Sequence, residues 1–383
     1  MNKRLKVRLY PTKKQKEVLD NHFNAYRFLY NLSLEYKIKM YKDYGINKSG
    51  YDLQAEIFEL RKEVDWLSKC KAECLRDAGL NVDKTFKKFF KGSGYPKFKS
   101  KKSESSFQAY QSVNCKGGVL NFYKQKIKFK TSKKYTALLN SHKIKQVTFK
   151  KDKCGDYWAT CLIDTEDIKQ LPKTDNIVGI DLGIKHLVIT SDGEFFENKR
   201  YFDITRKKLK RAQQKFSRTK KGSKNREKQA IKVAKIYRKI SRQREHYYHQ
   251  IVNKLLNENQ VIVMESLKVQ SMMEKKELSR LISDASWSLL TSMLEYKAQW
   301  YGREIVKIDT YFPSSKMCSS CGNIKQDLKL SDRIYKCSNC NLEIDRDYNS
   351  TLNIKNSGIK SPSEPVESEV TNLMKQELLT IKI

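Results

Sequence analysis

Two short runs of continuously apolar residues, each ending on an acid, constrain the fold of this chain more than any other feature. The first occupies 177–180 and ends at Asp181, and the second occupies 261–264 and ends at Glu265. Unbroken apolar runs of this length are typical of buried strands. A carboxylate at the end of a buried strand is costly to desolvate unless it is paired or bound to a metal ion. Both acids are therefore candidate metal ligands.

A third acid, Asp347, lies at the predicted start of a helix, in the run Asp-Arg-Asp-Tyr-Asn-Ser-Thr at 345–351. Three converging carboxylates would suit two Mg²⁺ ions roughly 3.5–4 Å apart, an arrangement that hydrolyses phosphodiesters. Each acid also has an ordinary explanation, since strand ends often carry an Asp and Asp347 could be a helix N-cap. Asp345 is the alternative for the third position. The residues alone support a metal-binding triad and three unrelated acids equally.

Four of the nine cysteines form two Cys-x2-Cys pairs, Cys318 with Cys321 and Cys337 with Cys340, separated by 15 residues. Each pair places two thiolates on one side of a metal ion, and two pairs complete a tetrahedral zinc shell. We expect this zinc to be structural, because the motif offers no fifth ligand and no adjacent base. Paired redox thiols are the alternative. The other cysteines are expected to be small buried apolar residues: Cys70, Cys74, Cys115, Cys154 and Cys161.

The 383 residues carry a formal net charge of +35, and 39% of them are hydrophobic. A folded chain with so much distributed positive charge is expected to bind a long polyanion, and nucleic acid is the obvious one. Membrane-surface binding is the alternative, but it usually needs a local basic amphipathic helix. We expect no membrane contact and a cytoplasmic protein. Three features favour this: no apolar run approaches the ~20 residues of a membrane span, the N-terminus has no apolar signal core, and the cysteine usage suits a reducing compartment.

Positive charge is densest at 199–246, where 20 Lys and Arg accompany three acids. Two helices are predicted there, split near 221–223. Three tyrosines are available for packing or base stacking, and core packing is expected for the first of them: Tyr237, Tyr247 and Tyr248. His246 and His249 could bind a metal ion. A solvated pair that faces nucleic acid is favoured, because no third ligand is near in sequence.

The first half of the chain is predicted to combine strands with an inserted helical segment. Residues 3–10 alternate apolar and basic side chains, as in a half-buried strand. Thr12 precedes Gln15 by three residues, a capping box that predicts the start of a long helix. Helices are expected to about residue 90 and short strands from 97 to 171, so a β unit begins early and resumes after the helices.

Several motifs together resemble the TnpB proteins, insertion-sequence-encoded relatives of the type V CRISPR effector nucleases. Phe-Pro-Ser-Ser-Lys-Met-Cys-Ser-Ser-Cys-Gly at 312–322 and Asp-Arg-Asp-Tyr-Asn at 345–349 are similar to the C-terminus of that family. Gly-Ile-Asp-Leu-Gly at 179–183 is similar to its first RuvC motif, and Met-Glu-Ser-Leu at 264–267 to its second. The remaining matching segments are 8–12, 95–99, 283–287, 294–297, and 330–340 with its second cysteine pair. The resemblance covers about residues 3–355.

This resemblance implies an RNA-guided DNA endonuclease that cleaves target DNA next to a short transposon-associated motif by a two-metal RuvC mechanism. Guide RNA and double-stranded target DNA are the implied partners. The resemblance places Asp181, Glu265 and Asp347 on the catalytic Mg²⁺-binding acids, in preference to Asp345, and the four paired cysteines on a zinc ribbon. Two departures remove no ligand: Asn-Ser-Thr stands at 349–351 where Asn-Ala-Ala is usual, and Asn341 stands where Gly is common.

The expected fold class is α+β multidomain. An N-terminal β-barrel-like domain with an inserted helical domain is followed by an RNase H-like (RuvC) α/β domain with a zinc-ribbon insertion. The predicted boundaries are 1–10 and 97–171 for the β (wedge-like) domain, 11–96 for the helical recognition insertion, 174–311 and 342–356 for the RuvC domain, 312–341 for the four-cysteine ribbon, and 357–383 for a flexible tail.

Three alternative functions are compatible with the same residues. A catalytically silent, guide-dependent DNA-binding repressor would be expected to lack one acid, whereas this chain retains all three. A transposase that joins strands also uses carboxylates and Mg²⁺. A type V CRISPR effector would differ only in genomic context.

Overall fold

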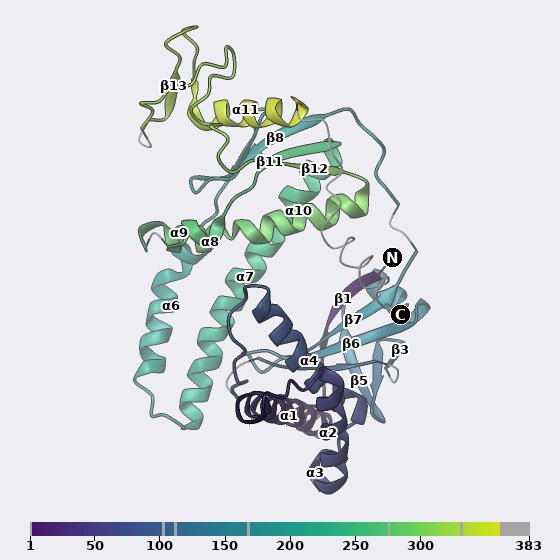
Figure 1. The fold of residues 1–383 in the computed structure, drawn as a ribbon. Coiled ribbons are helices and arrows are strands. Elements are labelled where there is room, and N and C mark those ends of the chain that lie inside the picture. The colour runs from purple at the N-terminus through teal and green to yellow at the C-terminus, as the bar shows by residue number, and fades with distance from the viewer. Residues whose placement is uncertain are drawn as a thin grey trace. The chain divides into compact units, whose positions relative to one another are not determined.

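The computed structural model describes residues 2–101, 104–110, 113–166, 169–274, 276–329 and 332–360 (Figure 1). These residues cluster into two compact units. One contains the described residues up to 166 together with 211–236, and the other contains 169–210 together with 237–360. Most of the predicted flexible tail, from 361 onward, lies outside the described residues, and residues 357–360 continue the last helix.

The first unit is built on a seven-stranded sheet of order β2-β6-β7-β1-β5-β4-β3, in which every neighbouring pair is antiparallel. The strand predicted at 3–10 joins the strands predicted after residue 97, because β1 pairs with both β7 and β5. Its apolar residues Leu5, Val7 and Leu9 are buried, as their alternation predicts. The strands are β1 (Asn2–Leu9), β2 (Ser105–Ala109), β3 (Asn114–Lys116), β4 (Val119–Phe122), β5 (Gln125–Lys130), β6 (Ile144–Lys151) and β7 (Tyr157–Asp164).

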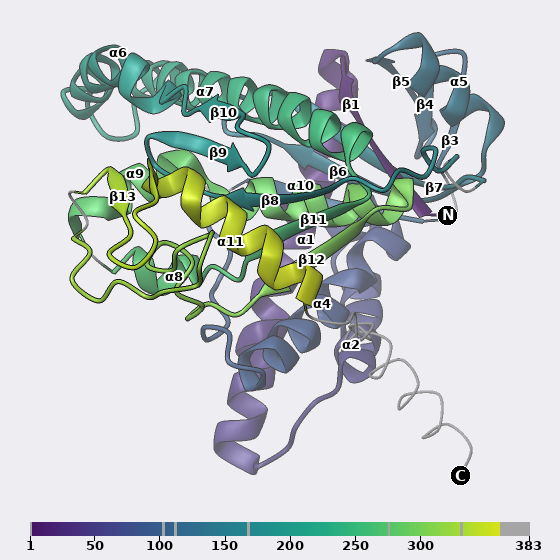
Figure 2. The same cartoon turned by 90° about the horizontal axis from the view of Figure 1, so that it is seen from above.

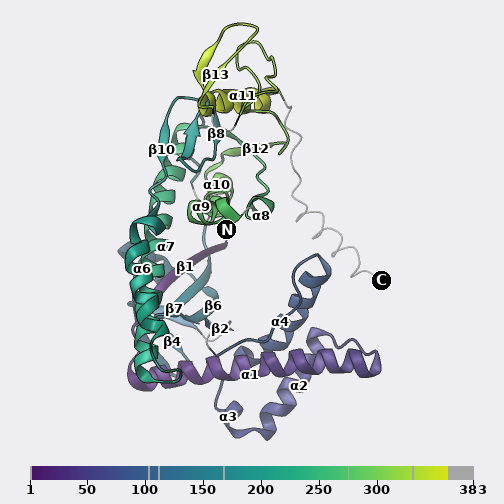
Figure 3. The same cartoon turned by 90° about the vertical axis from the view of Figure 1, so that its left-hand side faces the viewer.

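Four helices separate β1 from β2, and the first begins with the predicted capping box. The Thr12 hydroxyl accepts from the Gln15 N–H at 3.4 Å, and the Gln15 amide oxygen accepts from the Thr12 N–H at 3.0 Å. Figure 3 shows α1 as a long rod with α2 and α4 nearby, and Phe23 of α1 packs on Phe107 of the sheet. The helices are α1 (Lys13–Tyr44), α2 (Gly50–Glu63), α3 (Asp65–Ser68), α4 (Ala72–Phe90) and, later in the chain, α5 (Lys133–Ser141).

The second unit contains a five-stranded sheet of order β10-β9-β8-β11-β12. β8, β11 and β12 are parallel, whereas β9 and β10 continue from β8 as antiparallel neighbours. The turn predicted at 191–193 joins β9 to β10, and Gly193 adopts a φ of +83° there. The strands are β8 (Ile177–Asp181), β9 (His186–Thr190), β10 (Phe195–Glu197), β11 (Val261–Glu265) and β12 (Glu304–Ile308).

Helices cover both faces of this sheet, which explains why β8 and β11 are apolar up to the acid that ends each strand. Figures 1 and 2 show α11 (Arg346–Lys360) across one face and α10 (Trp287–Tyr301) beneath the other. Ile180 and Met264 pack with α10 and the end of α7, while Val263 packs with Ile354 of α11. The other helices are α6 (Tyr201–Ser217), α7 (Lys224–Glu258), α8 (Val269–Met272) and α9 (Lys276–Ala285). None of the helices described here is long and apolar enough to cross a membrane.

Two glycines let α11 lie directly on the strands. A Cβ at Gly179 in β8 would lie 2.3 Å from the Thr351 carbonyl oxygen and 2.6 Å from the Lys355 nitrogen. A Cβ at Gly358 in α11 would lie 2.5 Å from the Val263 methyl groups. Side chains essentially never approach backbone this closely, so the spacing between helix and sheet depends on both glycines.

The two basic helices predicted within 199–246 are present as α6 and α7, and Gly222 in the turn between them has a φ of +83°. One expected core position is wrong: Tyr237 is 45% exposed. The buried stripe of α7 begins instead at Ile240 and continues through Ile251 and Leu255. Only the second part of α7 therefore carries a fully buried face.

Candidate functional site

Two of the predicted acids lie side by side at one edge of the second sheet. Asp181 is the last residue of β8 and Glu265 is the last residue of β11. The two strands are parallel neighbours, with Met264 paired with Ile180, so their carboxyl ends meet at the same edge. Asp347 lies in the first turn of α11, which rests on these same strands.

The pKa values place the three carboxylates in one electrostatic environment. Burial, together with the charges of Glu265 and Asp347, raises the pKa of Asp181 to about 7. A backbone hydrogen bond from Leu182 and the charge of Arg346 act in the opposite direction. Burial also raises the pKa of Glu265. Added positive charge would therefore favour the ionised forms of Asp181 and Glu265.

The structure separates the roles of Asp345 and Asp347. Asp345 Oδ1 accepts hydrogen bonds from the backbone N–H groups of Asp347 at 2.9 Å and Tyr348 at 3.0 Å. This is the bonding pattern of a helix N-cap. The charge of the Asp347 carboxylate instead helps to raise the pKa of Asp181. The N-cap role considered for Asp347 thus belongs to Asp345.

Two arginines that the sequence analysis did not single out contact Asp347. Arg346 donates to Asp347 Oδ1 from Nε at 3.2 Å and from Nη2 at 3.0 Å. Arg333 Nη1 lies 3.9 Å from Asp347 Oδ2. The Arg346 side chain is only 13% exposed, so its charge offsets part of the repulsion between the acids. The contact of Arg346 with Asp347 could have been predicted, because Arg346 lies between two acids at the start of a helix. No local sequence pattern indicated the contact of Arg333.

Ser314, also missed from the sequence, connects the acids to the cysteine segment. Its hydroxyl donates a hydrogen bond to Glu265 Oε1, and its carbonyl accepts one from Asn353 Nδ2 at 2.8 Å. Asn349 and Asn353 of α11 each donate to the Met317 carbonyl at 2.7 Å. One helix thus fixes Asp347 directly and Glu265 through Ser314.

The two departures from the usual motif are accommodated locally. Ser350 and Thr351 are buried, and the Thr351 hydroxyl donates to the Tyr348 carbonyl at 2.7 Å. Asn341 has a φ of +58°, in the left-handed region that asparagine tolerates better than most residues. Neither change displaces an acid or a cysteine.

The four paired cysteines converge on one point. The Sγ atoms of Cys318 and Cys340 lie 3.6 Å apart, those of Cys321 and Cys337 lie 3.5 Å apart, and all four lie within 4.8 Å of one another. A tetrahedral zinc ion with Zn–S bonds of ~2.3 Å requires Sγ separations of about 3.8 Å. The donor set and its spacing therefore fit one Zn²⁺. Within the described ranges, no other three His, Cys, Asp or Glu side chains have their ligand atoms this close together. The ligand atoms of Asp181, Glu265 and Asp347 are farther apart than those of the cysteines.

Backbone geometry shapes both cysteine turns. The Cys318 N–H donates to the Asn323 carbonyl at 2.8 Å, and the Cys337 N–H donates to the Leu342 carbonyl at 2.9 Å. Backbone N–H groups near Cys340 lower the pKa of Cys337 to about 6, whereas burial raises the pKa of Cys318 to about 11. At neutral pH the cluster thus already offers a thiolate, the form that binds metal. A small sheet of β13 (Ile334–Lys336) and β14 (Glu343–Asp345) follows the first turn.

Removal of one of these cysteines should cost zinc and stability together. In Cys318→Ser we expect zinc content to fall well below one per chain and the unfolding temperature to drop, because the buried apolar cluster around these cysteines is small and consists, among the described residues, of Cys318, Tyr335 and Cys337. Metal analysis and thermal unfolding measure both quantities. Cys115→Ser, a partly exposed cysteine outside the cluster, is the control and should retain zinc. A Cys318→Ser protein with full zinc content and unchanged melting would contradict the assignment.

The other cysteines behave mainly as predicted apolar residues. Cys70, Cys74, Cys154 and Cys161 are buried, and Cys115 is partly buried. Burial raises the pKa of Cys70 to about 11 and that of Cys161 to about 12. The thiols of Cys70 and Cys161 are therefore protonated at neutral pH, and the protonated form is a poor nucleophile.

The tyrosines and histidines of α7 differ in what they can contact. Tyr248 is buried and donates to the Ala285 carbonyl, so its ring is not available for base stacking. Tyr247 is half-buried and donates to the Glu197 carbonyl at 3.0 Å. His246 is exposed, and neither it nor His249 belongs to a metal-binding group among the described side chains.

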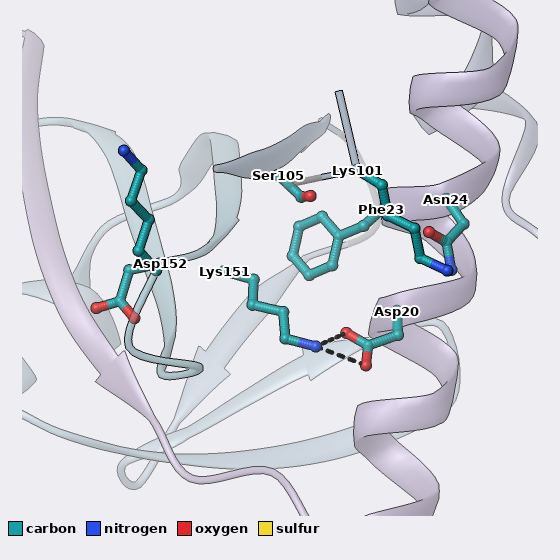
Figure 4. A pocket seen from close by; sticks show the side chains of 8 residues that line it. Asp20, Phe23, Asn24, Lys101, Ser105, Lys151 and Asp152 are labelled. Atoms are coloured by element: carbon teal, nitrogen blue, oxygen red, sulfur yellow. Dashed lines mark hydrogen bonds and ion pairs between the residues drawn. The ribbon is translucent and has the colours of Figure 1, made fainter. Parts of the chain in front are cut away.

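A basic hollow lies in the first unit between α1 and the end of β6 (Figure 4). Lys151 forms an ion pair with Asp20 at 2.8 Å, and the Lys101 side chain extends beside Asn24. The ion pair neutralises one lysine, and of the remaining charged residues that line the hollow, Lys101 and the exposed Lys153 outnumber Asp152 by one. The hollow therefore has a net positive character.

Three family descriptions match this chain in separate segments. "Probable transposase" (OrfB_IS605) matches residues 160–276, "Cas12f1-like, TNB domain" matches 287–354, and "Helix-turn-helix domain" (HTH_OrfB_IS605) matches 1–45. The second segment contains the four cysteines and Asp347. The first contains Asp181 and Glu265.

Two curated relatives align over most of the chain. A Streptomyces pristinaespiralis protein named "Putative RNA-guided DNA endonuclease" is 35% identical, and the alignment covers 92% of this chain and 89% of the relative. The Escherichia coli K12 protein "Putative RNA-guided DNA endonuclease InsQ" is 26% identical, with 77% of each chain covered. Among solved structures, the Cas12f1-sgRNA-target DNA complex has a similar fold, with a TM-score of 0.58, 16% identity and coverage of 93% of this chain and 98% of that one. This likeness confirms a mixed α+β architecture.

Proposed function

This chain belongs to the TnpB family, and from that membership we propose that it is an insertion-sequence-encoded RNA-guided DNA endonuclease that cuts target DNA next to a short transposon-associated motif. The observation that carries the proposal is the grouping of Asp181, Glu265 and Asp347 at one sheet edge, where burial and then the charges of Glu265 and Asp347 raise the pKa of Asp181 to about 7. Such strongly perturbed acids are typical of catalytic sites.

We propose the three acids as Mg²⁺ ligands and the four paired cysteines as ligands of a structural zinc. Carboxylate oxygens are the ligands Mg²⁺ prefers, and the excess negative charge of this cluster favours divalent cations. When bound, Mg²⁺ would supply an activated water and stabilise the leaving oxygen of the phosphodiester.

The protein's own groups would orient this cluster. Parallel β8 and β11 hold Asp181 and Glu265 at a fixed spacing, and the Ser314 hydroxyl restricts the rotation of Glu265. Arg346 restrains Asp347 and reduces the repulsion between the acids. Such preorganisation lowers the cost of holding several charged groups together at the reacting phosphate.

We propose that the second unit is an RNase H-like RuvC domain formed by 174–311 and 342–356, with 312–341 as its zinc-ribbon insertion. The strand order β10-β9-β8-β11-β12 supports this, because three antiparallel strands are continued by two parallel ones. We propose the seven-stranded sheet as the β (wedge-like) domain and α1–α4 as its helical recognition insertion.

Guide RNA and double-stranded target DNA are the proposed partners, and a net charge of +35 supports binding to both. In this arrangement base pairing with the guide would select the target, while the protein would contact backbone and the short flanking motif. We place the activity in the cytoplasm, where thiols stay reduced and available to zinc.

The test is to express the protein with its native flanking DNA, sequence the RNA that co-purifies, and assay cleavage of a plasmid with a randomised flanking motif. A defined guide and Mg²⁺-dependent cutting at the matching target are expected. A strand-joining transposase would copurify without a specific RNA. A silent repressor would bind the matched target and leave it uncut, and either result would contradict the proposal.

Charge reversal on α6 should weaken nucleic-acid binding and its salt dependence. Lys207, Lys208, Lys210 and Arg211 are all exposed on this helix. Each phosphate contact that is lost should lower the slope of log affinity against log salt by about 0.9 for duplex DNA. Titrations between about 50 and 200 mM salt measure this. Reversal of Lys329 and Lys336, exposed lysines of the cysteine segment, is the control, and an unchanged slope in the α6 variant would mean that this face is merely solvated.

A further inference from the structure

The junction between α9 and α10, residues 284–287, is held by side chains from distant parts of the second unit, and the proposed chemistry does not account for these contacts. Its third residue, Ser286, has a φ of +43°, although it is not a glycine. Residues with a side chain rarely adopt this left-handed conformation, and they keep it only where surrounding contacts impose it. Such strain is concentrated at functional sites, so the contacts of the 284–287 junction indicate what it holds in place.

Two residues of α7 fix this junction from one side. Arg244 donates from Nη2 to Asp284 Oδ1 at 2.7 Å and from Nη1 to the Ser286 hydroxyl at 2.8 Å. One helical turn later, the Tyr248 hydroxyl donates to the Ala285 carbonyl. The Arg244 and Asp284 side chains are only 16% and 7% exposed, so their ion pair is shielded from water. Because a guanidinium presents its donors in a rigid fork, its two contacts together determine where the junction lies.

The last residue of the junction, Trp287, contacts the loop that follows Asp181. Its indole Nε1 donates to the Gly183 carbonyl at 3.3 Å, across 104 positions of the chain. Gly183 lies in the loop between β8 and β9, which is so tight that a Cβ there would lie 2.7 Å from the His186 carbonyl oxygen. Trp287 is only 3% exposed, so water cannot readily replace its N–H as the partner of this carbonyl.

The same tryptophan borders the second acid. Trp287 and Glu265 line one hollow of about 250 Å³. Glu265 ends β11 and Asp181 ends the neighbouring parallel strand β8, so Trp287 adjoins the chain at both strand ends. The Leu182 N–H, one residue before Gly183, forms a hydrogen bond with the Asp181 carboxylate. A shift of this loop would therefore be transmitted to the carboxylate.

Resting on the proposed Mg²⁺ site, we propose that Trp287 is a positioning residue for Asp181 and that Arg244 acts through Trp287 by fixing the 284–287 junction. The indole N–H holds the Gly183 carbonyl, and the loop keeps the Asp181 carboxylate beside Glu265. Residues that orient metal ligands from behind typically change metal affinity or activity about ten- to a hundredfold when they are replaced. Neither Trp287 nor Arg244 needs to touch the metal ion or the DNA for this effect.

The first test removes the indole N–H and retains an aromatic ring. In the complete complex with guide RNA, Trp287→Phe should need about tenfold more Mg²⁺ than wild type for half-maximal cleavage of a guide-matched plasmid. At saturating Mg²⁺ its cleavage rate should approach that of wild type. Trp300→Phe makes the same chemical change near the other end of α10, at a partly buried position, and should leave the Mg²⁺ requirement unchanged. Thermal unfolding of both variants measures the loss of packing separately.

The second test measures metal binding without cleavage. Mn²⁺ prefers the same oxygen ligands as Mg²⁺ and is followed by electron paramagnetic resonance, with the Asp181→Ala complex defining the ions bound elsewhere. Trp287→Phe should weaken the remaining Mn²⁺ binding about tenfold. Arg244→Lys should also weaken it, because one ammonium replaces the fork that holds Asp284 and Ser286 together. Arg280→Lys makes the same change in the half-exposed ion pair with Asp203 and should bind Mn²⁺ as wild type does.

The possible results separate this inference from the proposed function. A Trp287→Phe complex that melts at a lower temperature but keeps the wild-type Mg²⁺ requirement and Mn²⁺ affinity would show that Trp287 only packs, and the inference would fail while the function stands. If wild type cuts no guided target, the proposed function fails. In that case weaker Mn²⁺ binding by Trp287→Phe would still support the positioning role, and unchanged binding would overturn it.

Discussion

Replacing Asp181, Glu265 or Asp347 by alanine, one at a time, is expected to abolish guided cleavage while guide RNA and target remain bound. Each carboxylate would lose its part in metal binding, which contributes several kcal/mol to phosphodiester hydrolysis, so rates should fall by about a thousandfold or more. Binding should persist because the acids are proposed to contact the metal ions and not the nucleic-acid backbone. The measurement is plasmid cleavage in parallel with a binding assay, and EDTA on wild type should reproduce the mutant result.

Asp345 provides the matched control for this experiment. It lies two residues from Asp347 but caps α11 through the N–H groups of Asp347 and Tyr348. Asp345→Ala should cost about 1 kcal/mol of stability and leave measurable cutting, and Asp345→Asn should restore the cap. Near-normal cutting by any of the three triad variants would refute the assigned acids. A complete loss in Asp345→Asn would show that the third acid was wrongly chosen.

Gly179→Ala is expected to destabilise the second unit and to stop cleavage. The new methyl group would lie 2.3 Å from the Thr351 carbonyl oxygen and 2.6 Å from the Lys355 nitrogen, both backbone atoms of α11. Relief of that clash requires the helix to move off the sheet, which carries Asp347 away from Asp181. Overpacking of this kind costs typically ~1–3 kcal/mol, and more where backbone must shift.

Thermal unfolding and cleavage assays measure both effects. Gly94→Ala is the control: a methyl group added there would meet no atom beyond its chain neighbours within 4 Å among the described residues, and the φ of Gly94 is not positive. Melting and activity of this control should therefore match wild type. A Gly179→Ala protein with wild-type melting and cutting would mean that α11 is not held at the distance described.

The features predicted correctly from the sequence are those that neighbouring residues determine. An apolar run of four or five residues defines β8 and β11, Thr12 and Gln15 define a capping box, and the cysteine pairs define their own turns. Each depends on residues a few positions apart, so the sequence is sufficient. The domain boundaries, in contrast, remain predictions.

What could not be predicted depends on segments that meet only after folding. The contact between Ser314 and Glu265 joins residues 49 positions apart, and Gly179 meets α11 across more than 170. The exposure of Tyr237 depends on where the fully buried face of α7 begins, which apolar spacing alone does not reveal. The N-cap role of Asp345 likewise became visible only in the hydrogen bonds of the helix start, whereas the preference for Asp347 as the third acid came from the family resemblance and remains a prediction.

The position of α11 in the chain has a consequence for biosynthesis. This helix is the last described element, yet it covers β8, made more than 160 residues earlier, and it delivers the third acid. A ribosome that has translated only as far as the zinc ribbon carries a chain with two of the acids and an uncovered apolar sheet. Such a nascent chain cannot complete the acid cluster. Under the proposed function, cleavage competence would therefore arise only once α11 has been made, and a chain interrupted before Asp347 would be unable to cut DNA.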